Sequence, residues 1–166
     1  IQLAGGVSIL LNARFKSFEL VSIIGHSDAR MLITTSRFDA SVDYSDVLTK
    51  TFPELAHAKA GEALGIAQAP LLETLVLFGE KRWAPAYSTE ALVERGRDIA
   101  DDVLVKARQW QSIAQTAVMY YTSGTTSMPK ACEISPAALQ RSWSIFARSV
   151  GLKAGEKVWV PMPFFH

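Results

Sequence analysis

A run of hydroxyl-bearing residues between two apolar stretches is the part of this chain best suited to chemistry. Residues 120–130, YYTSGTTSMPK, combine threonines and serines with one glycine, end in a proline–lysine pair and include no acidic residue. Backbone N–H groups can approach phosphate oxygens closely where a glycine removes the Cβ. Hydroxyl groups can donate hydrogen bonds to those oxygens or ligate a magnesium ion bound to them. The segment therefore predicts a loop that binds a polyphosphate.

Most residues of this loop have an expected role. Lys130 supplies a positive charge, Pro129 fixes φ just before it, and Gly124 lets the backbone approach the ligand. The other predicted phosphate-binding residues carry hydroxyls, and the first of them is also the candidate magnesium ligand: Thr122, Ser123, Thr125, Thr126 and Ser127. The pattern is not a Walker A loop, because Pro129 stands at its second glycine and Ala131 at its Ser/Thr position. A solvated turn is the alternative interpretation of such a composition.

The ten residues YTSGTTSMPK closely resemble the AMP-binding signature of the adenylate-forming superfamily, whose usual form is YTSGTTG-x-PKG. That superfamily includes acyl-CoA synthetases, luciferases and the adenylation domains of peptide synthetases. Ser127 and Ala131 stand where the signature has glycines. Both replacements keep the hydroxyl donors and the lysine charge, although either could reduce nucleotide affinity. Residues 5–34 resemble, less closely, the early segment of the same family.

A second motif lies at residues 163–166, PFFH. It resembles a strand-end motif of acyl-CoA synthetases that lies at the acyl pocket and at the mouth of the thiol tunnel. Ligands of open α/β sheets bind outside the carboxyl ends of strands. The resemblance therefore implies that Phe165 and His166 belong to the pocket for the acyl group or coenzyme A; a terminal histidine without a role is the alternative.

The elements that must position these motifs alternate between strand and helix. Strands are expected at residues 7–11, 30–34, 75–78, 118–122, 131–135 and 157–161. Helices are expected from an N-cap at Ser17 to about Gly25, from Ser45 to Pro53, at 89–96, within 101–114 and after an N-cap at Ser135. This alternation predicts an α/β fold with a sheet flanked by helices. By the resemblance, it is part of the large N-terminal domain of an adenylate-forming enzyme.

Three other features carry structural expectations. Residues 56–70 are rich in alanine and glycine and are expected to form a marginal helix or a surface insertion. Cys132 is expected to be a small buried side chain on the return strand. The apolar stripe of the last helix is expected to pack in the core: Leu139, Trp143, Phe146 and Val150.

Composition narrows the class of protein. The chain has 166 residues, 49% of them hydrophobic, which suffices for one globular core. A net charge of +1, from 17 basic and 16 acidic residues, provides no basic surface for nucleic acid. The single cysteine excludes an internal disulfide and fits a reducing compartment. No stretch reaches the ~20 apolar residues of a membrane span, so a cytoplasmic protein, at most peripherally attached to a membrane, is expected.

The resemblance implies a parent enzyme that activates a carboxylic acid with ATP and Mg²⁺ and then transfers the acyl group to coenzyme A. Both ends of the chain are apolar and strand-like, so residues 1–166 are expected to be a fragment of the N-terminal domain with negligible ligase activity by itself. Three alternatives stay open. The parent could load a carrier protein, as acyl-AMP ligases and adenylation domains do; it could be an atypical NTPase or phosphotransferase; or the chain could be a non-catalytic nucleotide-binding remnant.

Overall fold

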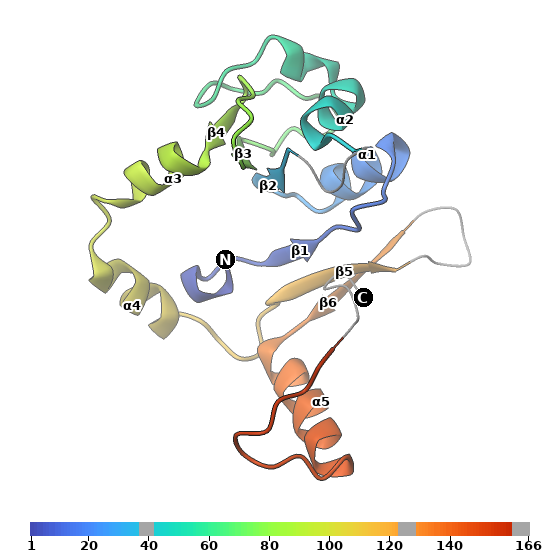
Figure 1. The fold of residues 1–166 in the computed structure, drawn as a ribbon, viewed down its shortest axis with the longest axis vertical. Helices are drawn as coiled ribbons and strands as arrows, with labels where there is room; N and C mark the ends of the chain where they lie inside the picture. The colour runs from blue at the N-terminus through green and yellow to red at the C-terminus, as the bar shows by residue number, and fades with distance from the viewer. Residues whose placement is uncertain (37–41, 123–128, 161–166) are drawn as a thin grey trace. The chain divides into compact units, whose positions relative to one another are not determined.

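A computed structural model describes residues 1–36, 42–122 and 129–160 (Figure 1). The chain divides into two compact units. Unit 1 is built from Ile1–Leu11, Asp101–Thr122 and the chain from Lys130 onward, and unit 2 from Asn12–Ala100. Each unit has a three-stranded sheet of its own, with helices beside it. The predicted α/β class is confirmed, with two small sheets in place of the one that was expected.

Unit 2 contains a parallel sheet in which β3 (Thr74–Phe78) lies between β2 (Met31–Thr35) and β4 (Ala86–Ser88). Leu32 pairs with Leu75, and Val76 with Tyr87. The central strand is continuously apolar and is buried at Leu75, Val76 and Leu77, as expected of a strand covered on both faces.

The helices of unit 2 supply the rest of its core. Helix α1 (Ser17–His26) buries Leu20, Ile23 and Ile24 on one face and packs against α2 (Tyr44–Thr51). Pro53 ends α2 and begins the 3₁₀ helix η2 (Pro53–Ala56), and Phe52 and Leu55 are fully buried there. Helix α3 (Thr89–Gly96) contacts β3 and β4 and has the predicted bounds.

Two helix starts differ from the expectation. Lys16, and not Ser17, occupies the N-cap of α1, where its N–H donates to the Glu19 carboxylate at 3.0 Å. Asp43, and not Ser45, caps α2, because its carboxylate accepts from the N–H groups of Ser45 and Asp46. In both places the predicted cap is a serine that follows the observed N-cap by one or two positions. The hydrogen bonds of the Glu19 and Asp43 carboxylates to backbone N–H groups decide where each helix begins.

Residues 56–70 form neither a helix beyond η2 nor a surface insertion. They follow an irregular path, yet Leu64, Ile66 and Ala69 are buried. Gly25 of α1 lies so close to this segment that an added Cβ would stand 2.3 Å from the carbonyl oxygen of Gln68. The segment is therefore held by tertiary packing against α1, which a search for helical periodicity does not detect.

Unit 1 contains a mixed sheet in which β5 (Val118–Thr122) pairs in parallel with β1 (Ser8–Leu10) and antiparallel with β6 (Lys130–Ile134). The 3₁₀ helix η1 (Gln2–Ala4) contacts α4 (Asp101–Gln109). Among the described residues of unit 1, only Val118 and Tyr121 are apolar side chains of the buried core.

Helix α5 (Pro136–Ser149) starts as predicted, with the Ser135 hydroxyl accepting from the Ala138 N–H at 3.3 Å and with Pro136 at its first position. Its apolar stripe is not in a core, because Trp143, Phe146 and Val150 are exposed. Cys132 is exposed too, contrary to the expectation. The described part of the predicted last strand, 157–160, belongs to no sheet. Each of these predictions assumed that other helices or strands cover α5, β6 and residues 157–160. The described residues of unit 1 do not form such a layer.

Candidate functional site

The β5–β6 hairpin carries the candidate phosphate loop at its open end. Directly opposed residues of an antiparallel pair project from the same face of the sheet. Val118 faces Ile134, Tyr120 faces Cys132, and Thr122 faces Lys130 on one side. Met119 faces Glu133 and Tyr121 faces Ala131 on the other side. Thr122 and Lys130 form the last pair of the ladder, so both strands deliver a predicted phosphate-binding residue to the mouth of the loop.

Thr122 and Lys130 are both exposed at this position. The Thr122 hydroxyl donates to the Lys130 carbonyl oxygen over a long 3.5 Å contact. A contact of that length is weak, and the hydroxyl oxygen keeps its lone pairs for a donor or a metal ion. The pairing thus presents one hydroxyl and one ammonium group at the same edge of the same face.

The charge of Lys130 is not neutralised within the part of the chain that the structure describes, where no ion pair involves it. The nearest acidic residue along β6 is Glu133, which projects from the opposite face. Its carboxylate accepts a hydrogen bond from the Thr116 hydroxyl at 2.7 Å, at the far end of the hairpin. Lys130 is therefore available to an anionic ligand at the loop mouth.

The other predicted site residues lie outside the described residues. These are the loop residues Ser123, Gly124, Thr125, Thr126 and Ser127, together with Phe165 and His166 of the PFFH motif. Their roles stay predictions.

Thr122 is also the candidate magnesium ligand. A neutral hydroxyl with free lone pairs fits a magnesium ion that arrives bound to phosphates, as one oxygen among several. A site made by the protein alone would need several carboxylates, and the described residues contain no cluster of three or more His, Cys, Asp or Glu side chains. Thr122 fits the ion as an auxiliary ligand and not as the centre of a binding site.

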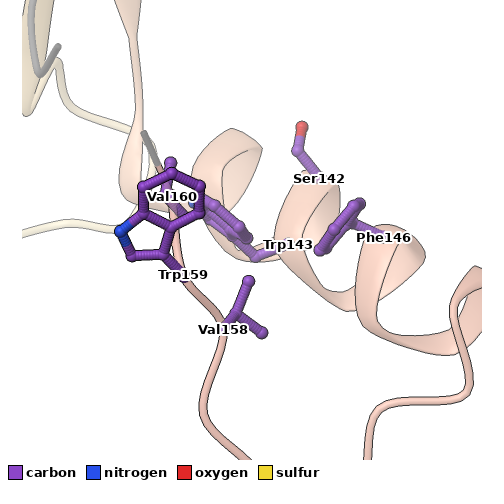
Figure 2. Close-up of a pocket in the computed structure, with 6 residues that line it drawn as sticks. All are labelled: Ser142, Trp143, Phe146, Val158, Trp159 and Val160. Atoms are coloured by element: carbon purple, nitrogen blue, oxygen red, sulfur yellow. The ribbon is translucent and has the colours of Figure 1, made fainter. Parts of the chain in front are cut away.

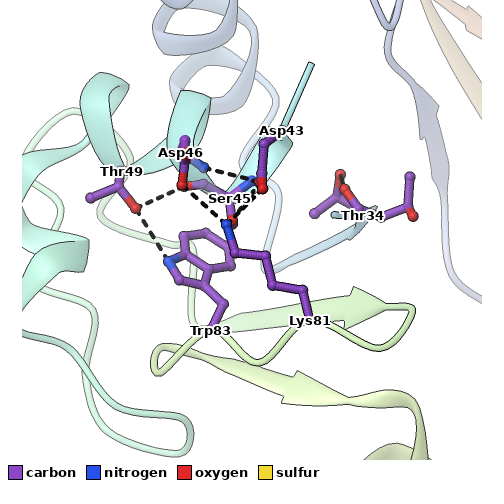
Figure 3. A network of polar contacts seen from close by, with 8 residues as sticks. Thr34, Asp43, Ser45, Asp46, Thr49, Lys81 and Trp83 are labelled. Carbon is purple, nitrogen blue, oxygen red and sulfur yellow. Dashed lines mark hydrogen bonds and ion pairs between the residues drawn. The ribbon is translucent and has the colours of Figure 1, made fainter. Parts of the chain in front are cut away.

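A second polar cluster lies in unit 2, where α2 meets the connection between β3 and β4 (Figure 3). The Lys81 ammonium donates to Asp43 at 2.6 Å and to Asp46 at 3.1 Å. The Ser45 hydroxyl donates to Asp43 at 2.6 Å. Trp83 joins the same cluster, since its indole N–H donates to the Thr49 hydroxyl at 3.2 Å. Lys81 and Trp83 thus tie the connection to the helix.

Electrostatics support a structural role for this cluster. Burial disfavours the charged form of Asp43, but hydrogen bonds from Lys81, Ser45 and the Asp46 backbone outweigh it and lower the pKa of Asp43 to about 2. The hydrogen bond to Asp43 raises the pKa of Lys81 above its ordinary value. In this cluster the ammonium group of Lys81 forms ion pairs with the carboxylates of Asp43 and Asp46. Lys130 at the hairpin mouth, in contrast, forms no ion pair with the described residues.

A family model described as "AMP-binding enzyme" matches residues 1–166. The chain belongs to the AMP-binding enzyme family. Among curated relatives, "Putative acyl-CoA synthetase YngI" of Bacillus subtilis (strain 168) is 28% identical over 162 residues, which cover 98% of this chain and 29% of the relative. "Acyl-CoA ligase sidI" of Aspergillus fumigatus is 24% identical over 162 residues, which cover 98% of this chain and 26% of that protein.

Among solved structures, the fold resembles the anthranilate CoA ligase AuaEII, crystallised in complex with anthranoyl-AMP. The TM-score is 0.52 with 19% identity, and the match covers 90% of this chain and 23% of the ligase. At that identity the likeness concerns the fold alone. This AMP-binding chain therefore resembles part of that ligase in fold, and it spans between a quarter and a third of the length of YngI and sidI.

The sequence did not reveal the link between Asp43 and Lys81, which are far apart along the chain. Asp43 precedes a hydroxyl and a second carboxylate at Ser45 and Asp46, and that pattern could have suggested it as a cap. No residue near Lys81 in the sequence indicated its partner.

None of the helices in residues 1–36, 42–122 and 129–160 has the length and apolar character that a membrane span requires.

Proposed function

We propose that this chain is part of an adenylate-forming ligase that activates a carboxylic acid with ATP and passes the acyl group to coenzyme A. The observation that carries the proposal is the Thr122–Lys130 pair at the mouth of the signature loop, a hydroxyl and an ammonium that forms no ion pair with the described residues. Family membership supports adenylation, and the acyl-CoA synthetase and CoA ligase among the relatives favour coenzyme A as the acceptor.

In the first step, a carboxylate oxygen of the substrate attacks the α-phosphorus of ATP. A new P–O bond forms, the bond to the β-phosphate oxygen breaks, and pyrophosphate leaves with the electron pair. The loop residues Ser123, Gly124, Thr125, Thr126 and Ser127 would hold the β- and γ-phosphates so that the leaving group stays in line. Lys130 would stabilise the charge that develops on the pyrophosphate.

Thr122 would supply one oxygen to a magnesium ion on the phosphates, and that ion neutralises charge on the leaving group when it is bound. In the second step, the thiol sulfur of coenzyme A attacks the acyl carbonyl, the C–O bond to AMP breaks, AMP leaves, and the thiol proton passes to solvent. Phe165 and His166 would line the pocket where the acyl group and the thiol meet.

The cytoplasmic location of the protein stays a prediction.

The test is exchange of labelled pyrophosphate into ATP by the full-length gene product, with a panel of fatty, aryl and short-chain acids. Acid-dependent exchange is expected, because adenylation is reversible before the thiol reacts. Lys130→Ala should reduce the exchange roughly 10- to 150-fold, the equivalent of about 1.5–3 kcal/mol for a hydrogen bond to a charged group. Lys153→Ala is the matched control, because Lys153 is an exposed lysine of unit 1 away from the hairpin, and it should leave the rate unchanged.

Other results would point to other functions. ATP cleavage to ADP without AMP would favour an NTPase, and exchange without acyl-CoA formation would favour transfer to a carrier protein. No exchange with any acid, together with no effect of Lys130→Ala on ATP binding, would favour a non-catalytic remnant. The 166-residue chain alone is expected to show negligible acyl-CoA synthesis, and a clear rate from it would contradict that expectation.

A further inference from the structure

The β5–β6 hairpin has one buried side chain near each of its ends. Of the residues that the structure describes in unit 1, Val118 and Tyr121 are the buried apolar ones, with 4% and 8% of their surface exposed. Val118 pairs with Ile134 at one end of the ladder, and Tyr121 pairs with Ala131 next to the other end. Tyr121 is therefore the buried side chain that lies beside the loop mouth.

The loop mouth is weakly held by its own side chains. Thr122 and Lys130 are exposed, and the 3.5 Å contact from the Thr122 hydroxyl to the Lys130 carbonyl oxygen is too long to be strong. The two residues form the last pair of the ladder. The ends of secondary structure open at little cost in free energy where few apolar contacts hold them. A neighbouring side chain must therefore keep the mouth closed.

The exposed apolar side chains of unit 1 lie elsewhere. Several of them line a groove beside α5 (Figure 2), where the rings of Trp143 and Phe146 meet edge to face with centroids 5.8 Å apart. None of the residues that line this groove belongs to β5 or β6: Ser142, Trp143, Phe146, Val158, Trp159 and Val160. The groove therefore adds no side chain to the hairpin ladder.

The Tyr121–Ala131 pair is joined directly to both site residues. Tyr121 precedes Thr122 in β5, and Ala131 follows Lys130 in β6. Because side chains alternate along a strand, Tyr121 and Ala131 project from one face, and Thr122 and Lys130 project from the other. Opposed Cβ atoms lie about 4.5–5.5 Å apart, which is close enough for the side chains to interact. Burial of Tyr121 on one face thus fixes the backbone that presents the two polar groups on the other.

We propose that Tyr121, paired with Ala131, is the positioning residue of the candidate phosphate loop. Its burial keeps the end of the hairpin closed and so holds the Thr122 hydroxyl and the Lys130 ammonium together at the loop mouth. Tyr121 acts through these two residues and not on ATP itself. This inference rests on the proposed function, because it names the residue that positions Lys130 for adenylation.

A double-mutant cycle in the full-length gene product tests the proposal. Tyr121→Ala should slow acid-dependent exchange of pyrophosphate into ATP roughly tenfold in the parent protein, a coupling of ordinary size for neighbouring residues. In the Lys130→Ala protein the same change should slow exchange by less than about threefold, because no ammonium group is left to position. An equal factor in the two backgrounds would overturn the proposal.

Val118→Ala is the matched control. Val118 is buried on the same strand, but at the end of the ladder away from the loop. Any effect of this variant on exchange should therefore be the same with and without the Lys130 ammonium. Tyr121→Phe keeps the buried ring and should retain most of the parent rate. A loss as large as that of Tyr121→Ala would contradict a role for ring burial.

Amide hydrogen exchange gives a readout that needs no activity. In Tyr121→Ala, the amides of residues 120–122 and 130–132 should exchange roughly tenfold faster than in the parent, whereas those of 117–118 and 134 should not change. Equal acceleration at both ends of the ladder would indicate a general loss of stability and refute the positioning role. Tyr121→Leu, which keeps an apolar side chain, replaces Tyr121→Ala if that variant does not fold, and the same local acceleration is expected.

The dissociation constant of ATP separates this inference from the proposed function. Absence of exchange with every acid, in a parent protein that still binds ATP, would count against the ligase and not against the positioning role. The cycle is then read from the dissociation constants, and Tyr121→Ala should weaken ATP binding more in the parent than in the Lys130→Ala protein. A parent protein that binds no ATP would overturn both.

Discussion

Replacement of Gly25 by alanine tests how tightly unit 2 is packed. Gly25 lies in α1, and an added Cβ would stand 2.3 Å from the Gln68 carbonyl oxygen. Carbon and oxygen atoms need roughly 3.5 Å, so helix and segment must separate by about 1 Å. Because the obstacle is backbone, it cannot rotate away, and α1 is anchored by buried Ile23 and Ile24.

The expected magnitude follows from two opposing effects. Overpacking of this kind costs about 1–3 kcal/mol, whereas alanine in place of glycine in a helix gains up to about 1 kcal/mol. The Gly25→Ala chain should therefore be less stable by about 1–2 kcal/mol. For a unit of this size, each kcal/mol lowers the unfolding midpoint by roughly 4–8 °C. Thermal unfolding followed by far-UV circular dichroism measures the change.

Gly96→Ala is the matched control. Gly96 is the last residue of α3, also in unit 2, and an added Cβ there meets nothing within 4 Å. Only the gain in helix propensity remains, so this variant should be as stable as the parent chain or a few tenths of a kcal/mol more stable. If Gly25→Ala were as stable as Gly96→Ala, the close packing of α1 against residue 68 would be refuted.

Two further predictions concern polar groups. The pKa of Asp43 is lowered from 3.8 to about 2, so its ionisation stabilises the fold above about pH 4, and this contribution is lost as the pH falls toward 2. Asp43→Asn keeps an N-cap side chain and removes the charge that holds Lys81. Urea unfolding should show a loss of about 1 kcal/mol at pH 7, after allowance for solvent screening, and a clearly smaller loss at pH 2, where the Asp43 carboxyl is about half protonated. An equal loss at both pH values would contradict this. Ser135→Ala removes the N-cap of α5 and should cost about 1 kcal/mol in the same assay, whereas Ser135→Asp should restore most of it.

Helix caps, prolines and short apolar runs correctly predicted those helices and strands whose bounds are set by residues nearby in the sequence. The N-cap and proline at Ser135 and Pro136 fixed the start of α5, and α3 was predicted with its observed bounds. The residues that flank the loop likewise predicted the strands before and after it, at 118–122 and 131–135. The observed return strand begins one residue earlier, and Lys130 pairs with Thr122 there. In these places the residues that decide the structure lie within a few positions of one another.

The predictions that were wrong concerned residues whose environment is set by distant parts of the chain. The irregular segment 56–70 is held by burial of Leu64 and Ile66 and has no periodicity to detect. The stretch 157–160 has the composition of a strand, but a strand needs a partner. Cys132 was expected to be buried because the strand was assumed to be covered. The Asp43–Lys81 ion pair likewise joins residues that are 38 positions apart, so no local pattern in the sequence indicates it.

The parallel pairing of β1 with β5 has a consequence for biosynthesis. Ser8 pairs with Val118, and the whole of Asn12–Ala100 lies between them in the chain. As a polypeptide leaves the ribosome, β1 emerges first but cannot pair until β5 has followed it. Unit 2, with its own core, can fold during that delay. Its folding also shortens the disordered chain between the two strands and so reduces the chain entropy lost when the β1–β5 pair closes. A mutation that slows unit 2 should then delay assembly of the hairpin that carries the loop, without touching either strand.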